Sequence, residues 1–318
     1  MQKSQLTIII PFLNEGIEVE NTVSSILETS TTNPSIILIN DFSDDGYDYD
    51  VLSSRSKSIL LINHEKRYGV ANSRNEGVKI CDTEYFLLLD AHMRFYEEGW
   101  DRKLISHLEE NQNSLLCSQT KFLMKDINGS VINTEENFSY GAYIDDINKL
   151  NILWNKFDTN PLNNIIETPC ILGAAYACSK IFWNHMRGLN GLLSYGLDEQ
   201  LLSIKVWLAG GKCLLIKDWV VGHIYRDSFP YSIPNKNFLY NKLYLAELLF
   251  PVNIKQEVFH YQKQINYKIF EESYSILRRN YVDIKKEKAA LKNIFTKKLS
   301  SFFKANRRIK LMNSVQIK

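Results

Sequence analysis

The sequence predicts an α/β fold built on a parallel sheet, and two observations support this prediction. Short, wholly apolar runs alternate with segments of helical periodicity through the first 90 residues, and polar side chains follow directly after several of these runs. Apolar runs without polar alternation are typical of strands that helices cover on both faces. Because such sheets bind ligands at the carboxyl ends of their strands, we expect a functional site where these strands end.

The expected strands of this first part are 6–11, 35–40, 59–63 and 85–90, and the expected helices are 19–29 and 70–80. Residues 134–161 are polar and irregular, which predicts a mobile flap. Further along, 171–178 and 213–216 are expected to be strands, and 198–209 a helix that ends at two glycines. After Pro234 the pattern becomes helical, which predicts a helical C-terminal region.

The composition is typical of a globular protein, with 45% hydrophobic and 23% charged residues among 318. The five cysteines contain no CxxC pair, which argues against a zinc site and favours buried, reduced thiols. The N-terminal segment lacks the pattern of a signal peptide, and no run approaches the roughly 18 apolar residues of a membrane span. We therefore expect a cytoplasmic protein.

The charge is unevenly distributed along the chain. Residues 255–318 carry 16 lysines and arginines against five acidic residues, a net charge of +11, which leaves −9 for the rest. A solvated helical face would explain this pattern, and so would attraction to an anionic lipid surface, an acidic acceptor or an acidic partner. No recognised nucleic-acid-binding module accompanies the charge, so nucleic acid is not an expected partner.

Two short motifs carry chemistry. Asp90-Ala91-His92 ends an apolar strand and places a carboxylate and an imidazole two residues apart, on the same side of the chain. Such a pair can hold Mn²⁺ or Mg²⁺ beside a diphosphate, although an aspartate at this position is more often a cap or turn residue. His223 follows a second strand-like segment and Gly222, and it is the expected third ligand.

Seven segments in order resemble the GT-A glycosyltransferases, broadly family 2, and within them the catalytic domain of the polypeptide N-acetylgalactosaminyltransferases. The similarity runs from about residue 6 to residue 231. The segments are LTIIIPFLNE, INDFSDDG, YGVANSRNEG, LLLDAHMRFYEEGW, ETPCILGAAYACSK, GLDEQLLSIKVWLAGGKC and VGHIYRDSFPY.

The resemblance implies a role for each matching residue. The residues that would line the uridine pocket are Pro11, Asn14, Glu15 and Asp41. Arg74 would face the nucleotide or diphosphate, and Gly173 and Ala174 would border the sugar. Arg226 and Tyr231 would belong to a loop over the diphosphate. The ligands of Mn²⁺ (or Mg²⁺) would be Asp90, His92 and His223.

The departures from the family pattern concern the metal motif, the sugar and the catalytic base. Ala91 replaces serine, and Ala174 replaces the second glycine of a Gly-Gly pair, which would crowd the sugar. Asp198-Glu199 stands where retaining enzymes of the family have Glu-Asn and inverting ones have Glu-Asp with the aspartate as base. Glu199 occupies that base position, so inversion is favoured over retention. Acidic residues that favour the N-terminus of a helix are the alternative explanation of both carboxylates.

The resemblance and the motifs together predict a metal-dependent glycosyltransferase. It would move a sugar, a hexose or an N-acetylhexosamine, from a UDP-sugar to a glycan, a lipid-linked acceptor or a protein. The catalytic domain would span residues 1–233 and the helical basic region 234–318. The alternatives are a nucleotide-sugar-binding protein without turnover and a nucleotidyltransferase. The first would lack the metal ligands or the base, and the second would need a glycine-rich phosphate loop near the N-terminus, which the sequence lacks.

Overall fold

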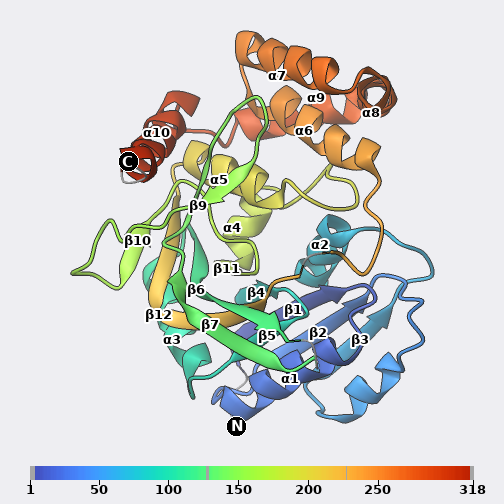
Figure 1. Cartoon of the computed structure of the whole chain (residues 1–318), viewed down its shortest axis with the longest axis vertical. Coiled ribbons are helices and arrows are strands. Elements are labelled where there is room, and N and C mark those ends of the chain that lie inside the picture. The colour runs from blue at the N-terminus through green and yellow to red at the C-terminus, as the bar shows by residue number, and fades with distance from the viewer. Residues whose placement is uncertain (1–3, 127–128, 227, 316–318) are drawn as a thin grey trace.

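The computed structural model describes residues 4–126, 129–226 and 228–315. The start of the first predicted domain and the end of the second therefore lie outside the described residues. It confirms a mixed α/β architecture, in which helices flank a large sheet and a helical region follows it (Figure 1). Among the described residues no helix is long and apolar enough to cross a membrane.

The first four strands form the parallel half of the sheet, as predicted, in the order β4-β1-β2-β3. They are β1 (Leu6–Phe12), β2 (Ser35–Asn40), β3 (Ile59–Asn63) and β4 (Tyr85–Leu89). Helices α1 (Ile17–Thr29) and α2 (Val70–Ile80) connect them where helical periodicity was expected, and a short 3₁₀ helix (Tyr49–Ser54) precedes β3.

The other half of the sheet is largely antiparallel, so the predicted parallel pairing holds for the first four strands and does not extend to this half. The order continues from β4 through β11, β6 and β12 to β10, with β5 beside β12 and β7 beside β6. Only β6 and β12 are parallel neighbours. Hydrophobic runs indicate burial on both faces but carry no information on strand direction. The sequence therefore did not predict that strands in this half pair in antiparallel fashion. The strands are β5 (Met93–Phe95), β6 (Ser114–Lys125), β7 (Val131–Phe138), β10 (Ile165–Glu167), β11 (Ala175–Ser179) and β12 (Lys212–Ile224).

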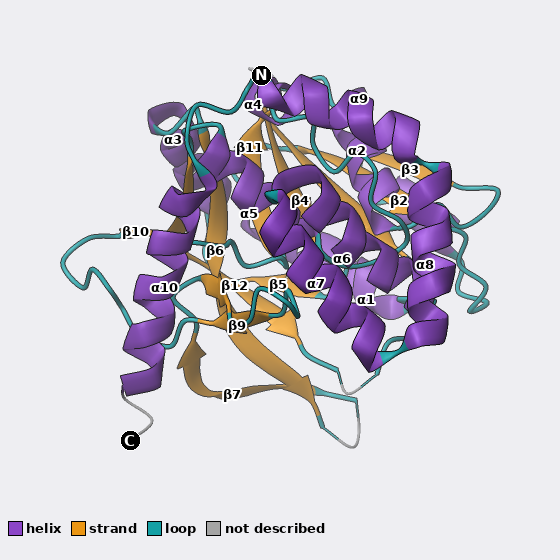
Figure 2. Cartoon of the chain, turned by 90° about the horizontal axis from the view of Figure 1, so that it is seen from above, coloured by secondary structure: helices purple, strands orange, loops and turns teal. Residues whose placement is uncertain are grey.

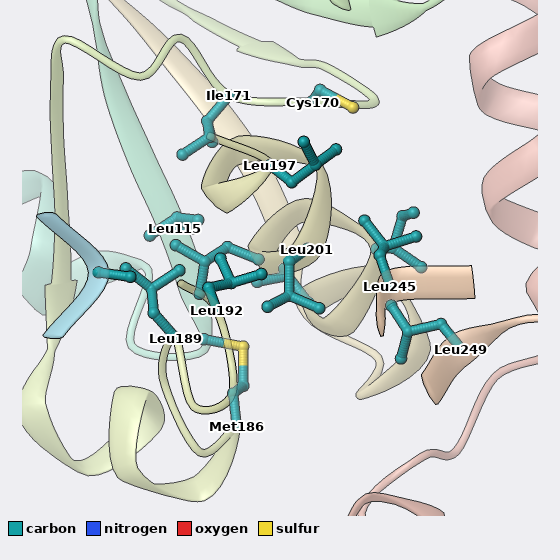
Figure 3. Packing of buried hydrophobic residues seen from close by; sticks show 14 of the residues in the cluster. Leu115, Cys170, Ile171, Met186, Leu189, Leu192, Leu197, Leu201, Leu245 and Leu249 are labelled. Atoms are coloured by element: carbon teal, nitrogen blue, oxygen red, sulfur yellow. The ribbon is translucent and has the colours of Figure 1, made fainter. Parts of the chain in front are cut away.

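Alternate side chains of each central strand enter two separate cores. Ile8 and Ile10 of β1 pack with α1 and α3 (Trp100–Glu110), whereas Ile9 points to the face that carries α2, α4 (Lys180–His185) and α5 (Asp198–Leu208). Figure 3 shows the second core at the place where Leu201 of α5 meets Leu245 and its neighbours from the C-terminal region. Both faces of the central strands are therefore sealed, and the free space lies at the strand ends.

The predicted irregular flap over 134–161 is wrong in part. The segment contains the end of β7, and then β8 (Ala142–Ile144) and β9 (Ile152–Trp154), which form a two-stranded ladder. All three residues of β8 are buried, and the Ala142 amide donates to the Cys170 carbonyl at 3.1 Å. Three consecutive apolar residues in a polar stretch were enough to make a strand here, because a second strand and the main core cover them.

The C-terminal helices share a core with the sheet. α6 (Asn235–Leu249), α7 (Val252–Ile265), α8 (Tyr267–Arg279) and α9 (Tyr281–Lys292) pack together, while α10 (Leu299–Val315) lies apart from them, along α5 and β8 (Figures 1 and 2). Buried residues of α6 to α10 belong to the same apolar cluster as α5. At the predicted boundary after residue 233 the chain changes from sheet to helices, but the apolar core continues across it. The division of the chain into two domains stays a prediction.

Candidate active site

A cavity of about 360 Å³ lies where the carboxyl ends of β1 and β4 meet the start of α5 and the end of β12. Thirteen of the fourteen predicted site residues line it, and Asn14 does not. The thirteen are Pro11, Glu15, Asp41, Arg74, Asp90, His92, Gly173, Ala174, Asp198, Glu199, His223, Arg226 and Tyr231. Segments that are far apart in the sequence thus meet at one site, which is what ligand binding at strand ends requires.

The three predicted metal ligands lie together. Asp90 follows β4 directly, and the pairing of β5 with β12 places Met93 opposite His223, so His92 and His223 become neighbours. The Nε2 atom of His223 is 3.6 Å from Oδ2 of Asp90, and the two imidazole centroids are 4.8 Å apart. One ligand atom from each of the three residues lies within 4.8 Å of the others. A single divalent cation could therefore contact all three.

The electrostatics of this cluster suit a cation. Burial lowers the pKa of His223 below its usual range against the opposing effect of Asp90, which keeps the imidazole neutral and able to donate its lone pair. Burial raises the pKa of Asp90, but the His223 hydrogen bond and the charge of Arg74 outweigh it, so the net pKa is lowered and the carboxylate stays ionised. The buried Nδ1 of His223 finds no hydrogen-bond partner in the described part of the chain. A carboxylate and two imidazoles form a donor set that fits Mn²⁺.

Glu15 connects this cluster to the loop after β12. Its Oε2 lies 3.2 Å from Nδ1 of His92 and also forms an ion pair with Arg226. Burial raises the pKa of Glu15, yet the hydrogen bonds and charges of His92 and Arg226 outweigh burial and lower it. The carboxylate therefore orients both His92 and the 225–231 loop at the mouth of the cavity.

Arg74 is buried and joins the two acidic parts of the site. Its guanidinium donates to Oδ1 of Asp90 at 2.8 Å and to Asp198, and it lies 5.3 Å from the ring centroid of Tyr176. Asp198 is the first residue of α5, so Arg74 ties the end of β4 to the start of that helix. Contact between Arg74 and a nucleotide stays a prediction.

Glu199 differs from Asp198 in forming no ion pair with a cationic side chain among the described residues. Its carboxyl packs on Gly173, where an added Cβ would be only 2.1 Å from Oε1 of Glu199. Burial, together with the negative charge of Asp198, raises the pKa of Glu199 to about 8. A carboxyl with a pKa near neutrality, on the wall of a cavity, is typical of a group that exchanges protons during a reaction.

Asp41 organises the loop that precedes α2. Its carboxylate accepts hydrogen bonds from the amides of Tyr68 and Gly69, both at 2.8 Å, and lies 2.9 Å from Nδ1 of His64. Since Asp41 also lines the cavity, it both shapes the loop and borders the space for a ligand. Its contact with uridine stays a prediction.

The same loop touches the segment before α5 at Gly69. Gly69 has a φ of 92° and ψ of 153°, a conformation that L-residues rarely adopt, and a Cβ would lie 2.5 Å from the Cα of Ser194. The Val70 amide donates to the Ser194 carbonyl at 2.9 Å. This close backbone approach fixes the Asp41 side of the cavity relative to the acidic pair on α5.

We expect Gly69→Ala to lower the free energy of unfolding by roughly 2–4 kcal/mol, because strain in φ adds to a clash with backbone that cannot rotate away. Urea unfolding followed by circular dichroism measures this loss. Gly46→Ala is the control, since Gly46 also has a positive φ, 77°, but no atom lies within 4 Å of its added Cβ. Equal losses in the two variants would show that the approach to Ser194 does not matter.

Asn14 holds two turns together and does not line the cavity. It adopts a left-handed conformation, φ 56°, and its side chain donates to Asp44 at 2.8 Å while accepting from the Asp44 amide at 2.8 Å. These bonds hold the turn after β1 against the turn after β2. Any role of Asn14 in binding uridine stays a prediction.

Several cavity residues had not been predicted. Tyr195 and Phe229 face each other with centroids 5.0 Å apart, and Trp154 of β9 lies 5.1 Å from Tyr225. Arg67 lies 4.9 Å from the ring centroid of Tyr231. Aromatic residues in loops resemble core residues in sequence, so only the fold identifies them as the walls of the cavity.

The comparisons with known proteins agree with this description. A family model described as "Glycosyl transferase family 2" matches residues 7–166. Human polypeptide N-acetylgalactosaminyltransferase 16 is 26% identical over 249 residues, which cover 73% of this chain and 42% of that protein. The human transferase 3 is 27% identical over 268 residues, covering 76% and 40%. This chain thus spans about two fifths of the length of these relatives.

Two solved structures are similar in fold. The crystal structure of GalNAc-T7 with UDP, GalNAc and Mn²⁺ aligns with a TM-score of 0.65 at 20% identity, covering 86% of this chain and 57% of that one. The crystal structure of S. aureus TarS aligns with a TM-score of 0.50 at 11% identity, covering 82% and 42%. The fold is therefore of the GT-A type. The family match, which covers half of the sequence, makes the identification narrower: the chain belongs to glycosyltransferase family 2.

Proposed function

We propose that this protein transfers a hexose or an N-acetylhexosamine from a UDP-sugar to an acceptor hydroxyl, with a divalent cation, Mn²⁺ or Mg²⁺, held by Asp90, His92 and His223. The observation that carries the proposal is the convergence of these three side chains within 4.8 Å in the cavity at the strand ends of a family 2 fold. The similar GalNAc-T7 structure holds UDP, GalNAc and Mn²⁺, which supports this pairing of donor and cation.

The cation would stabilise the charge that develops on the departing diphosphate. Around it, Asp90 supplies a carboxylate that stays ionised, and His92 is oriented by Glu15. Arg226, paired with Glu15 at the cavity mouth, is placed to approach the diphosphate and to exclude water from it.

Glu199 is proposed as the base that accepts the proton of the acceptor hydroxyl. Asp198 is engaged by Arg74, so its charge is already neutralised, whereas the carboxyl of Glu199 lies against Gly173 on the wall of the cavity. Attack assisted by this base from the face opposite the leaving group gives inversion, which we favour over retention. The acceptor would be a glycan, a lipid-linked sugar or a protein side chain.

The two alternative functions find less support. A nucleotide-sugar-binding protein without turnover has no need of a carboxyl with a pKa near 8 beside the metal ligands. For a nucleotidyltransferase, the turn after β1 would have to cradle phosphates, but its Asn14 is bonded to Asp44. A cytoplasmic location, suggested by five free and buried cysteines, stays a prediction.

A panel of UDP-sugars, incubated with the protein and with Mn²⁺, Mg²⁺ or EDTA, tests the proposed function. We expect UDP release from one donor to be stimulated by the cation at least tenfold over EDTA, because slow hydrolysis replaces transfer when the acceptor is missing. Binding of UDP in the presence of Mn²⁺, measured by calorimetry, is the second readout. No cation-dependent binding of UDP and no release from any donor would overturn the proposal.

A further inference from the structure

The last helix carries a basic and apolar face that the site does not use. Between residues 288 and 315 the sequence has eight lysines and arginines and no aspartate or glutamate. Within α10, six residues line a groove of about 590 Å³, and their spacing of three or four places them on one side of the helix. They are Ser300, Phe303, Lys304, Arg307, Arg308 and Leu311.

The opposite side of α10 is fully occupied. Phe302, Ile309 and Asn313 are buried. Asn306 exchanges two hydrogen bonds with the backbone of Ile144 in β8, at 2.7 and 2.8 Å, and Asn313 binds Asn155 at 2.9 Å. The helix is therefore held in one orientation, and the face defined by Lys304, Arg307, Arg308 and Leu311 points outward.

The outward face combines charge with apolar surface. Lys304, Arg307 and Arg308 are exposed, and none of them has an ion-pair partner in the part of the chain that is described. Leu311 is 52% exposed beside them, and Met312 is 37% exposed. Basic side chains next to exposed aliphatic side chains on one helix are typical of a segment that lies in the plane of an anionic bilayer. In such a segment the apolar side chains enter between the lipid headgroups.

We propose that the outer face of α10, Lys304, Arg307, Arg308 and Leu311, docks the protein on an anionic phospholipid surface. We choose an anionic membrane because the positive face of α10 is complementary to its charge. Residues 1–254 have a net charge of −9 and would be repelled by the same surface. The protein would thus approach with α10 foremost. A soluble polyanion would match the charge but would leave Leu311 in water, so it fits the face less well.

The docking surface is connected to the active site through β8 and β9. α10 binds the backbone on both sides of this ladder, and Trp154 at the end of β9 borders the cavity. Docking would therefore place the rim of the cavity near the lipid headgroups. The inference itself does not depend on the proposed reaction, because it concerns binding alone.

Sedimentation with vesicles tests the proposal. The intact protein is mixed with vesicles of phosphatidylcholine alone or of phosphatidylcholine with phosphatidylglycerol. We expect binding to the anionic vesicles only, with a loss as salt is added, because screening weakens the attraction. The triple variant Lys304→Glu, Arg307→Glu, Arg308→Glu should partition at least about a hundredfold more weakly. The control Lys268→Glu, Arg279→Glu, Lys286→Glu changes net charge equally on exposed parts of α8 and α9 and should bind as the wild type does.

Leu311→Ser separates a membrane from a soluble anion. It should weaken binding to anionic vesicles severalfold and leave binding to soluble polyglutamate unchanged, while Val282→Ser, at a site 65% exposed on α9, should change neither. Thermal unfolding checks that each variant is folded. The proposal is overturned if anionic vesicles bind no better than neutral ones, if the two triple variants bind equally, or if polyglutamate binds as tightly as vesicles and Leu311→Ser has no effect.

Discussion

Replacing His223 by alanine is expected to reduce cation-stimulated release of UDP from the donor sugar at least about a thousandfold. The reason is that the cation would stabilise the charge on the departing diphosphate by several kcal/mol. The side chain is 12% exposed and reaches to within 3.6 Å of Asp90, so no other described imidazole except His92 can replace it. Calorimetric titration of Mn²⁺ should show weaker binding in parallel. The expected change thus has one readout for activity and one for the metal alone.

The control for this experiment is His260→Ala, which removes an exposed imidazole of α7 far from the cavity and should change neither readout. Wild-type protein should also gain thermal stability on addition of Mn²⁺, whereas His223→Ala should not, since a cation that binds only the folded state stabilises it. Unchanged Mn²⁺ affinity in His223→Ala would show that the three side chains meet for another reason, such as a structural hydrogen-bond cluster.

The sequence was informative where burial alone decides the structure. Strands β1, β2 and β4 are buried on both faces, so their apolar runs were continuous and gave their positions within about one residue. Strand β6 was missed because Ser118, Gln119 and Thr120 interrupt its apolar run, although all three are buried in the folded chain. They are buried because β6 lies between β11 and β12 in the sheet, and no local pattern shows that in advance.

For the site, the sequence suggested three candidate metal ligands that the structure brings together, but not the contacts around them. The alignment of His223 beside His92 depends on the pairing of β5 with β12, which is tertiary information. Arg74 matched a family motif, yet its burial between Asp90 and Asp198 follows from where α5 begins relative to β4. Trp154 could not be predicted because β9 lies in a segment whose sequence is mostly polar.

The distinction between Asp198 and Glu199 has a thermodynamic consequence. The guanidinium of Arg74 is the cationic group beside these two adjacent carboxyls, and it bonds to Asp198. Burial and the charge of Asp198 then raise the pKa of Glu199 to about 8, well above 4.5, its ordinary value. The folded state therefore holds a proton on Glu199 that the unfolded chain releases at neutral pH. Stability linked to this group is complete below pH 4.5 and is lost as pH rises towards 8.

We expect Glu199→Gln to lower kcat for sugar transfer by about 10²- to 10⁴-fold, the usual contribution of a general base, and to leave the affinity for UDP and Mn²⁺ within about twofold. In the wild type, kcat/KM should rise with pH until about pH 8 and then level off, because only the ionised carboxylate accepts a proton. The residual activity of the variant should lack this rise. Equal losses in transfer and in donor binding would instead assign Glu199 to holding the donor.

The same substitution should stabilise the protein, and only in alkaline solution. An amide needs no ionisation to remain in the cavity wall, so Glu199→Gln should raise the free energy of unfolding by on the order of 2 kcal/mol at pH 9 and have little effect at pH 5. Asp198→Asn is the matched comparison, because it removes the ionised partner of Arg74 and should destabilise the protein at both pH values. A Glu199→Gln variant that is less stable than wild type at pH 9 would mean that the carboxyl is ionised without cost, and its selection as the base over Asp198 would then lose its physical ground.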